Sequence, residues 1–147
     1  MKIGLDVHGC IDSYPDIFSK FSKNLVDKGH EVHIITGRGW DIAEGEVKRL
    51  GMSYTHHFSI VDYHKSLNTP MWRNEKQGWE MDASTWNRSK GDYIWKNGID
   101  IHFDNDHEYV NWMPDSCTVI LVPENPDFNY NNRSTQFHKF VELIKLI

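Results

Sequence analysis

The sequence predicts an α/β fold, with 147 residues arranged as one domain around a parallel β-sheet. Short apolar runs that lack polar alternation indicate strands buried on both faces. Amphipathic helical patterns separate these runs, so strands and helices follow one another at the spacing of βαβ units. Since single domains most often have about 100–150 residues, we expect residues 1–147 to form one folding unit.

The first strand–helix unit occupies the start of the chain. Residues 3–5 form a short apolar strand. Ser13 and Pro15 have the character of a helix start, with a capping hydroxyl followed by a proline in the first turn. Apolar residues recur at helical spacing as far as Val26, and Gly29 ends the predicted helix.

The second unit repeats this order. It has a strand at residues 32–36 and a helix at 40–50, which Gly51 terminates. Residues 54–61 predict a further strand. Residues 62–89 fit no regular pattern, and we interpret them as an inserted loop or small flap, because loops of this length are usually functional. Three tryptophans lie in this segment, namely Trp72, Trp79 and Trp86.

The remaining elements complete the predicted sheet. A short helix is expected at residues 90–98, followed by a strand at 99–103 that runs into the acidic residues 104–106. The last strand is predicted at 118–122, and an amphipathic helix at 134–147 closes the chain. Together these elements predict a three-layer Rossmann-like domain with a parallel sheet and a small loop or flap insertion.

Composition excludes several classes of protein. The formal net charge of −5 argues against general affinity for nucleic-acid phosphates. Two cysteines, Cys10 and Cys117, are too few for a disulfide scaffold. No apolar stretch approaches the roughly 20 residues that span a bilayer, and the N-terminus does not resemble a signal peptide. We therefore expect a cytoplasmic protein without a membrane partner.

Polar side chains gather at the predicted carboxyl ends of the strands. Asp6 and His8 follow the first strand, Thr36 ends the second, and Asp104 follows a later one. Lys90 begins the helix that leads into that later strand. Ligands of open α/β folds bind at this edge of the sheet, where such side chains converge. Carboxylate oxygens suit Mg²⁺, and hydroxyl and ammonium donors suit phosphate oxygens.

These residues stand in motifs that resemble those of the haloacid dehalogenase (HAD) superfamily. Residues 3–12, Ile-Gly-Leu-Asp-Val-His-Gly-Cys-Ile-Asp, resemble its first motif, and residues 33–38, His-Ile-Ile-Thr-Gly-Arg, resemble its second. Lys90 stands where the lysine of the third motif is expected. Residues 101–106, Ile-His-Phe-Asp-Asn-Asp, resemble the acidic fourth motif. The resemblance runs in order along most of the chain and leaves the middle segment unmatched.

The resemblance implies a fold of the HAD type and a Mg²⁺-dependent phosphatase acting on a phosphate monoester. Asp6 would attack phosphorus and form an aspartyl-phosphate. Asp6, His8 and Asp104 would form the metal site, with Asn105 or Asp106 assisting directly or through water. Thr36 would donate to the phosphoryl group, and Lys90 would neutralise charge on it.

The substrate side of the site is less defined by the motifs. Gly37 and Arg38 are the candidate substrate-binding residues, and Arg73 and Arg88 are further candidates for contacts to distal groups. Lys65 competes with Lys90 for the phosphate-facing role, because it too lies in the unassigned middle segment. Candidate substrates are a phosphorylated small molecule, a nucleotide or a nucleic-acid end, since a minimal cap leaves the edge of the sheet open.

His8 departs from the motif, because phosphatases of the family normally have a second aspartate there. Histidine can perform general acid–base catalysis near neutral pH. Three outcomes stay open: a phosphatase with an altered pH dependence, a different reaction, or a weakened protein that binds phosphate or a partner. The tryptophans offer a further alternative, because they either pack the flap or stack on a base, as in a single-strand nucleic-acid binder.

The nine histidines raise the question of zinc. His56, His57 and His64 are the nearest cluster, but their spacing matches no known zinc pattern. Adjacent histidines on a strand also point to opposite faces. We therefore do not expect a structural zinc site at these positions.

Overall fold

The computed structural model describes residues 1–76, 78–123 and 132–146. It contains a five-stranded sheet in the order β3-β2-β1-β6-β7, in which every neighbouring pair is parallel. The strands are β1 (Lys2–Leu5), β2 (Glu31–Thr36), β3 (His56–Ser59), β6 (Ile101–Asp104) and β7 (Thr118–Leu121). The predicted α/β fold with a parallel, broadly Rossmann-like sheet is therefore confirmed.

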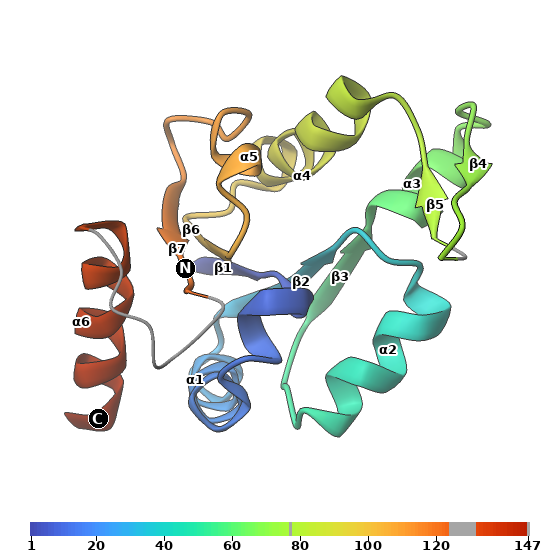
Figure 1. The fold of residues 1–147 in the computed structure, drawn as a ribbon. Coiled ribbons are helices and arrows are strands. Elements are labelled where there is room, and N and C mark those ends of the chain that lie inside the picture. Colours follow the sequence, from blue (N-terminus) through green and yellow to red (C-terminus); the bar gives the residue numbers. More distant parts are fainter. Residues whose placement is uncertain (77, 124–131, 147) are drawn as a thin grey trace.

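Helices cover both faces of the sheet and complete the three layers (Figure 1). One face packs against α1 (Pro15–Asp27), α2 (Trp40–Arg49) and α6 (Asn132–Leu146). The other faces α3 (Ile60–Ser66), α4 (Ala83–Asn97) and the short α5 (His107–Val110). The predicted closing helix is thus present, and the last residue assigned to it lies outside the described residues.

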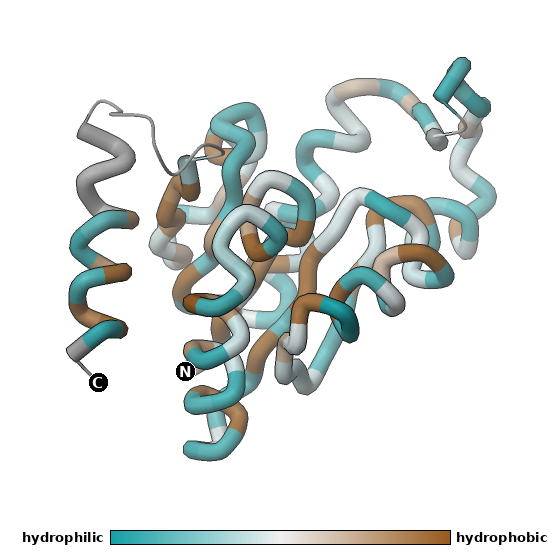
Figure 2. The backbone as a smooth tube through the Cα atoms, turned by 60° about the horizontal axis from the view of Figure 1, so that its bottom comes forward, coloured by the Kyte–Doolittle hydropathy of each residue, from teal (hydrophilic) through white to brown (hydrophobic). Residues whose placement is uncertain are grey.

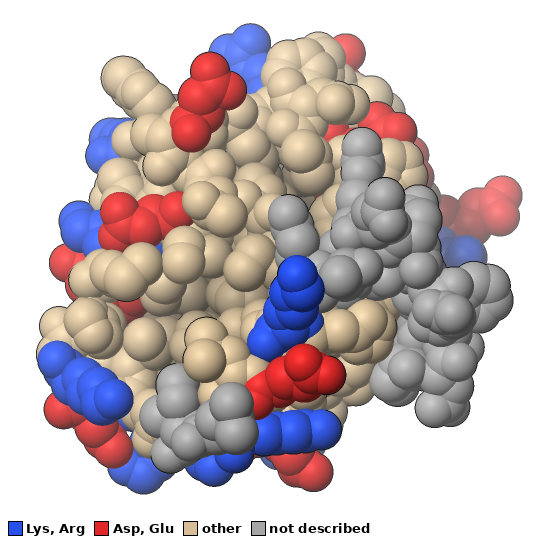
Figure 3. Space-filling model, turned by 90° about the vertical axis from the view of Figure 1, so that its left-hand side faces the viewer, with Lys and Arg blue, Asp and Glu red and all other residues tan. Residues whose placement is uncertain are grey.

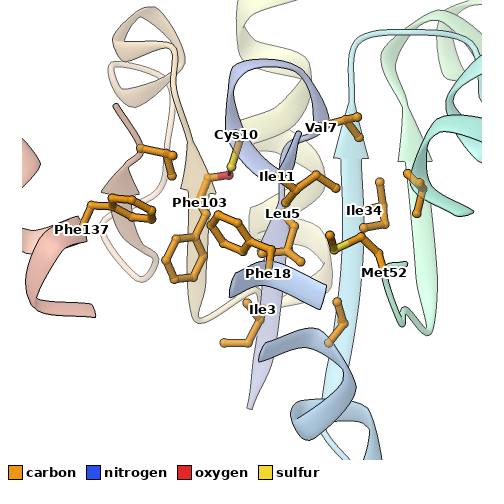
Figure 4. Close-up of a cluster of buried hydrophobic side chains, with 13 residues drawn as sticks. Ile3, Leu5, Val7, Cys10, Ile11, Phe18, Ile34, Met52, Phe103 and Phe137 are labelled. Carbon is orange, nitrogen blue, oxygen red and sulfur yellow. Dashed lines mark hydrogen bonds between the residues drawn. The ribbon is translucent and has the colours of Figure 1, made fainter. Parts of the chain in front are cut away.

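The larger core lies between the sheet and α1, α2 and α6. Phe18 of α1 meets Phe103 of β6 edge to face, with 5.5 Å between ring centroids, and Phe137 of α6 packs on the same group (Figure 4). Burying each such ring contributes about 1.5–3 kcal/mol. Figure 2 shows hydrophobic residues concentrated in the strands and on the inner sides of the helices. This core holds the strands in register and so fixes the positions of their carboxyl ends.

The predicted strand at residues 54–61 is wrong in its second half. The strand ends at Ser59, and α3 begins at Ile60. The Ser59 hydroxyl accepts the backbone N–H of Asp62 at 3.1 Å and caps this helix. Ile60 and Val61 are both buried, and together with Phe58 they read as an apolar run that hides the boundary in the sequence.

The predicted helix at residues 90–98 is too short. The helix α4 starts at Ala83, and Asp82 caps it by accepting the backbone N–H of Thr85 at 3.0 Å. Lys90 therefore lies in the middle of this helix and not at its start. The buried positions of α4 include Ser89, Lys90 and Gly91, and such residues leave no apolar stripe for sequence reasoning to find.

The inserted segment is narrower than residues 62–89, since helices take up both of its ends. Between α3 and α4, the described residues 67–76 and 78–82 form what we call the hairpin segment. Its strands β4 (Trp72–Arg73) and β5 (Trp79–Glu80) pair antiparallel. The Asn74 side-chain oxygen supports the turn by accepting the backbone N–H of Gly78 at 2.8 Å. In Figure 1 this hairpin stands beside α3, away from α6.

The charged surface is mixed on the side of the molecule that carries α6. Figure 3 shows acidic and basic side chains interspersed on this side, without a large patch of either sign. Among the described helices, none is both long and apolar enough to cross a bilayer. A concentration of one charge with a role in function would lie on another side of the described surface, because the side with α6 is mixed.

Candidate active site

Three charged side chains meet at the carboxyl edge of the sheet. The Lys90 ammonium donates to Asp6 Oδ1 and to Asp104 Oδ2, both at 2.8 Å. The two carboxylates are therefore held on either side of one cation. Of the residues that the structure describes, none donates to Asp6 Oδ2, so that oxygen remains available to a ligand.

Strand order explains why these residues meet. Strands β1 and β6 are neighbours in register, with Leu5 opposite Phe103. The backbone N–H of Asp6 donates to the Phe103 carbonyl at 3.0 Å and extends this pairing by one residue. Asp104 is the last residue of β6, so both carboxylates lie at the same edge, and α4 carries Lys90 across them.

Burial and charge together set the ionisation of this trio, which has almost no exposed surface. Burial, reinforced by the nearby Asp104 charge, raises the pKa of Asp6 to about 6 despite the opposing charge of Lys90. Burial acts in the same direction on Asp104, but the Lys90 charge and the His102 hydrogen bond outweigh it and lower the pKa of Asp104. Burial disfavours the Lys90 cation, yet Asp104 and Asp6 outweigh this and raise the pKa of Lys90.

Asp104 has two further contacts, one with His102 of the same strand and one with the loop that follows the strand. His102 Nε2 lies 3.0 Å from Asp104 Oδ2, and the backbone N–H of Asp106 donates to Asp104 Oδ1 at 3.1 Å. The fully buried His102 ring fits because residue 4 is glycine, where an added Cβ would lie 2.6 Å from His102 Nδ1. Sequence reasoning missed His102, since a lone histidine in a buried strand matches no catalytic spacing.

The turn after Asp6 brings it close to the β6 loop. Gly9 has a φ of +76°, a conformation that costs glycine little and other residues more. A Cβ at Gly9 would lie only 2.3 Å from Asn105 Nδ2, so the two loops approach too closely for any larger residue. Glycine at this position therefore serves both the turn and the packing around Asp6.

His8 lies at the mouth of the site and contacts α2. Its Nε2 is hydrogen bonded to Glu46 Oε2, and Arg38 Nη1 lies 3.3 Å from Glu46 Oε1. Glu46 thus orients both an imidazole and a guanidinium that line the cavity described below. Sequence reasoning missed Glu46 as well, because one glutamate on an amphipathic helix resembles an ordinary solvated residue.

At the end of β2, Thr36 is buried, whereas the next two residues, Gly37 and Arg38, face the site. Thr36 is fully buried, and its hydroxyl accepts the backbone N–H of Arg38 at 3.3 Å. Gly37 and Arg38 line the cavity, whereas Thr36 lies behind them. A Cβ at Gly37 would lie 2.7 Å from the Trp86 ring, so glycine lets α4 close this side.

A cavity of about 560 Å³ opens over Asp6, within the usual range for small-molecule sites. Trp86 and Tyr109 form part of its wall, where Trp86 Nε1 donates to the Tyr109 hydroxyl at 2.8 Å. The Tyr109 ring in turn lies 4.2 Å from the Lys90 ammonium. The tryptophan nearest the carboxylates is therefore held by hydrogen bonding, and it shapes the wall of the site.

Three cations of the middle segment have different positions. Lys65 and Arg73 line the cavity, from α3 and the hairpin segment respectively. Arg88 does not line it, and instead pairs with Asp92 at 3.4 Å on the exposed side of α4. Lys65 reaches neither Asp6 nor Asp104, so the lysine beside the carboxylates is Lys90.

The acidic residues at the edge of the sheet fit a hard divalent cation. Two carboxylates, those of Asp6 and Asp104, contact the single charge of Lys90, and Asp106 adds a third carboxylate to the cavity lining. Asp6 and Asp106 line the cavity, and Asp104 lies directly behind them. Oxygen ligands and two excess negative charges suit Mg²⁺. His8 is hydrogen bonded to Glu46 through Nε2, which leaves Nδ1 as its remaining ligand atom.

The three histidines considered for zinc have separate partners. His56 lies against His33, with the rings stacked at 4.3 Å between centroids. His57 stacks on Trp40 at 3.9 Å. His64 is buried, and its Nε2 lies 2.8 Å from the hydroxyl of Ser89. These three side chains therefore do not share one site.

A different nitrogen-rich group lies where β2 and β3 begin. One ligand atom from each of Glu31, His33 and His56 lies within 4.8 Å of the others. Both ring nitrogens of His33 already have partners, with Tyr93 at 2.7 Å and Glu31 at 2.9 Å. Nitrogen ligands suit zinc-like metals better than Mg²⁺, and this group is at the far end of the strands from Asp6.

Comparison with known proteins adds no assignment to this geometry. A scan against protein-family models found no match. A search of curated proteins likewise returned none. Inferences about chemistry therefore depend on the arrangement of Asp6, Lys90 and Asp104 and on the cavity above them.

Proposed function

We propose that the protein is a Mg²⁺-dependent phosphatase that hydrolyses a phosphate monoester through an aspartyl-phosphate at Asp6. The observation that carries this proposal is the bridge from Lys90 to Asp6 and Asp104 at the base of the cavity. The order of the motifs, which resembles that of the HAD superfamily, is a second and independent support. A nucleotide, another phosphorylated small molecule or a nucleic-acid end fits the open cavity.

Asp6 would act as the nucleophile. Its carboxylate attacks phosphorus, the bond between phosphorus and the ester oxygen breaks, and the alcohol leaves. Lys90 keeps Asp6 oriented through Oδ1 and offsets the charge of the approaching phosphate. Bound Mg²⁺, held by Asp6, Asp104 and Asp106, would reduce repulsion between the carboxylate and the anionic phosphoryl oxygens.

His8 would supply and recover the proton. The imidazolium protonates the leaving oxygen, and the resulting neutral ring then takes a proton from the water that hydrolyses the aspartyl-phosphate. Glu46 accepts a hydrogen bond from Nε2, which leaves Nδ1 for these transfers. Arg38, on the other oxygen of Glu46, keeps that carboxylate in place.

Phosphate release from a panel of monoesters tests the proposal. We expect wild-type turnover with Mg²⁺, none with chelator, and a loss of at least about 10³-fold in Asp6→Asn, because the nucleophile is removed. Asp16→Asn, at an exposed position of α1, is the matched control and should retain wild-type activity. Turnover that survives Asp6→Asn would exclude Asp6 as the nucleophile.

His8 and Glu46 are tested with the same panel. Glu46→Gln should lower kcat about 10- to 100-fold with little change in KM, since the imidazole loses its orienting carboxylate. His8→Asp should remain active and shift the pH optimum. If the wild type has no turnover and His8→Asp does, the protein is instead a weakened binder of phosphate or of a partner.

A further inference from the structure

We propose that Lys65 and Arg73, held against the Trp79 ring, form a second anion site that binds a further phosphate of the substrate. The inference rests on the proposed function and specifies its substrate class: a phosphate monoester whose alcohol part carries another phosphate. Nucleoside bisphosphates and 5′-phosphorylated oligonucleotides share this chemistry.

The first observation is the positive charge of the side chains that line the cavity. The chain has a net charge of −5, yet four cations line the cavity besides Lys90. They are Arg38, Lys65, Arg73 and Lys76. Opposite charges there, apart from Asp6, come only from Asp41 and Asp106 among the described lining residues. Positive charge is thus concentrated where a substrate would enter, which favours a ligand with more than one anionic group.

The hairpin segment places its basic and acidic side chains on opposite faces. Arg73 and Trp79 are opposite each other in the antiparallel pair, and both line the cavity. The other pair, Trp72 and Glu80, lies outside the cavity lining, with Trp72 Nε1 donating to Glu80 at 2.9 Å. Since successive side chains of a strand point to opposite faces, the hairpin presents its cation to the site and its acid away from it.

Trp79 brings two cations together. The Lys65 ammonium lies 4.7 Å from the centroid of its ring, and the Arg73 guanidinium lies 4.3 Å from it. No carboxylate within the described part of the chain lies within salt-bridge distance of Lys65. Both cations line the cavity beside this ring, so a phosphate that enters this part of the cavity would accept hydrogen bonds from both.

This arrangement separates the second phosphate from the one that reacts. The transferred phosphoryl group must meet Asp6, where Lys90 already supplies the positive charge. Lys65 and Arg73 come from α3 and the hairpin, and neither contacts Asp6 or Asp104. A base stacked on Trp79 would compete with the two cations for the ring, so anion binding is the better use of this wall.

The test compares a nucleoside 5′-monophosphate with the corresponding 3′,5′-bisphosphate, using phosphate release with Mg²⁺. We expect kcat/KM to favour the bisphosphate by about 10- to 100-fold, as hydrogen bonds to a charged group provide. In Lys65→Gln/Arg73→Gln this preference should fall to about one, because the bisphosphate loses far more kcat/KM than the monophosphate. Lys48→Gln, on the exposed side of α2, is the charge-matched control and should keep the preference.

Two further comparisons ask how Arg73 acts and where the second phosphate comes from. Arg73→Lys should keep more of the preference for the bisphosphate than Arg73→Gln does, because lysine keeps the charge but not the two-pronged donor. A 5′-phosphorylated oligonucleotide that exceeds the bisphosphate in kcat/KM identifies a nucleic-acid end as the source of the second phosphate. The reverse order identifies a small molecule. Equal kcat/KM for all three substrates overturns the second site.

A binding measurement tests the second anion site independently of the proposed phosphatase activity. Calorimetric titration of Asp6→Asn with the monophosphate and with the bisphosphate compares their affinities and requires no turnover. Tighter binding of the bisphosphate, lost in the triple variant that also carries Lys65→Gln and Arg73→Gln, supports the site even if no monoester is hydrolysed. Turnover of the monophosphate without any preference for the bisphosphate in rate or binding leaves the proposed function standing and removes the second site.

Discussion

Asp6 is the residue for which function and stability conflict most clearly. It is buried beside a second carboxylate, and one lysine compensates for both. Burial raises the pKa of Asp6 to about 6, above the ordinary value of 3.8. Folding therefore disfavours the ionised form that the proposed nucleophile requires, and the charge of Asp6 lowers the free energy of unfolding progressively as the pH rises from about 4 to above 6.

The replacement Asp6→Asn should accordingly stabilise the metal-free protein at pH 8 by about 1–3 kcal/mol. The gain should decrease as the pH falls through 6 and vanish below about pH 3, where Asp6 is protonated in the folded and unfolded states. Urea unfolding in chelator at a series of pH values measures this difference. A difference between the two proteins that does not change with pH would contradict the assignment of the raised pKa to Asp6.

Sequence reasoning could find the residues at this scale that stand at strand ends or in motifs. Asp6, Asp104 and Lys90 were predicted as parts of one site, and the structure does bring them together. It could not find Glu46 or His102. Each acts through one contact made across the fold, and neither contact leaves a spacing in the sequence.

At the scale of elements, α4 determines where Lys90 is held. This helix lies so close to the segment after α5 that a Cβ at Gly91 would be 2.0 Å from the Trp112 carbonyl oxygen. Backbone atoms on both sides leave little room to adjust. The glycine next to Lys90 therefore sets the depth of the helix, and with it the reach of the ammonium to both carboxylates.

Two matched substitutions of helical glycines should have opposite signs. Gly91→Ala should lower the free energy of unfolding by about 1–3 kcal/mol, because the helix must shift, and it should impair phosphate release. Gly45→Ala, on the exposed side of α2 with 3.6 Å to the nearest Arg49 atom, should raise it by about 0.5–1 kcal/mol. Denaturant unfolding of both variants provides the comparison. A neutral Gly91→Ala would show that α4 is not packed as described.

Elements with an apolar pattern were predictable, and those without one were not. The strands β1, β2, β6 and β7 agree with the predicted runs to within a residue or two. The start of α4 was missed because the buried residues Ser89, Lys90 and Gly91 are polar or small. The boundary between β3 and α3 was missed because Phe58, Ile60 and Val61 form an apolar run interrupted only by Ser59. These are the elements that carry Lys90 and Lys65.

In the molecule as a whole, the parts that stabilise the fold are separate from the candidate site. The core against α1, α2 and α6 stabilises the sheet, whereas the acidic residues and the cavity lie at the carboxyl edge of the sheet. A ligand that binds only the folded protein stabilises it by mass action. Metal binding at the carboxylates should therefore be visible in the stability of the entire domain.

We expect Mg²⁺ at about 100 times its Kd to raise the free energy of unfolding by about 2.7 kcal/mol. Asp106→Asn should reduce the effect, because it removes a carboxylate from the cavity while asparagine can still cap α5. Thermal unfolding with Mg²⁺ and with chelator measures the shift. An equal shift in wild type and in Asp6→Asn/Asp106→Asn would assign the ion to another part of the molecule.

The lysine bridge has a consequence for the protein without its metal. Because an ammonium from the chain itself already compensates the two innermost acids, the fold does not depend on a bound cation to offset their charge. Under the proposed function, scarcity of magnesium would leave the protein folded but inactive, and less stable by the free energy of ion binding.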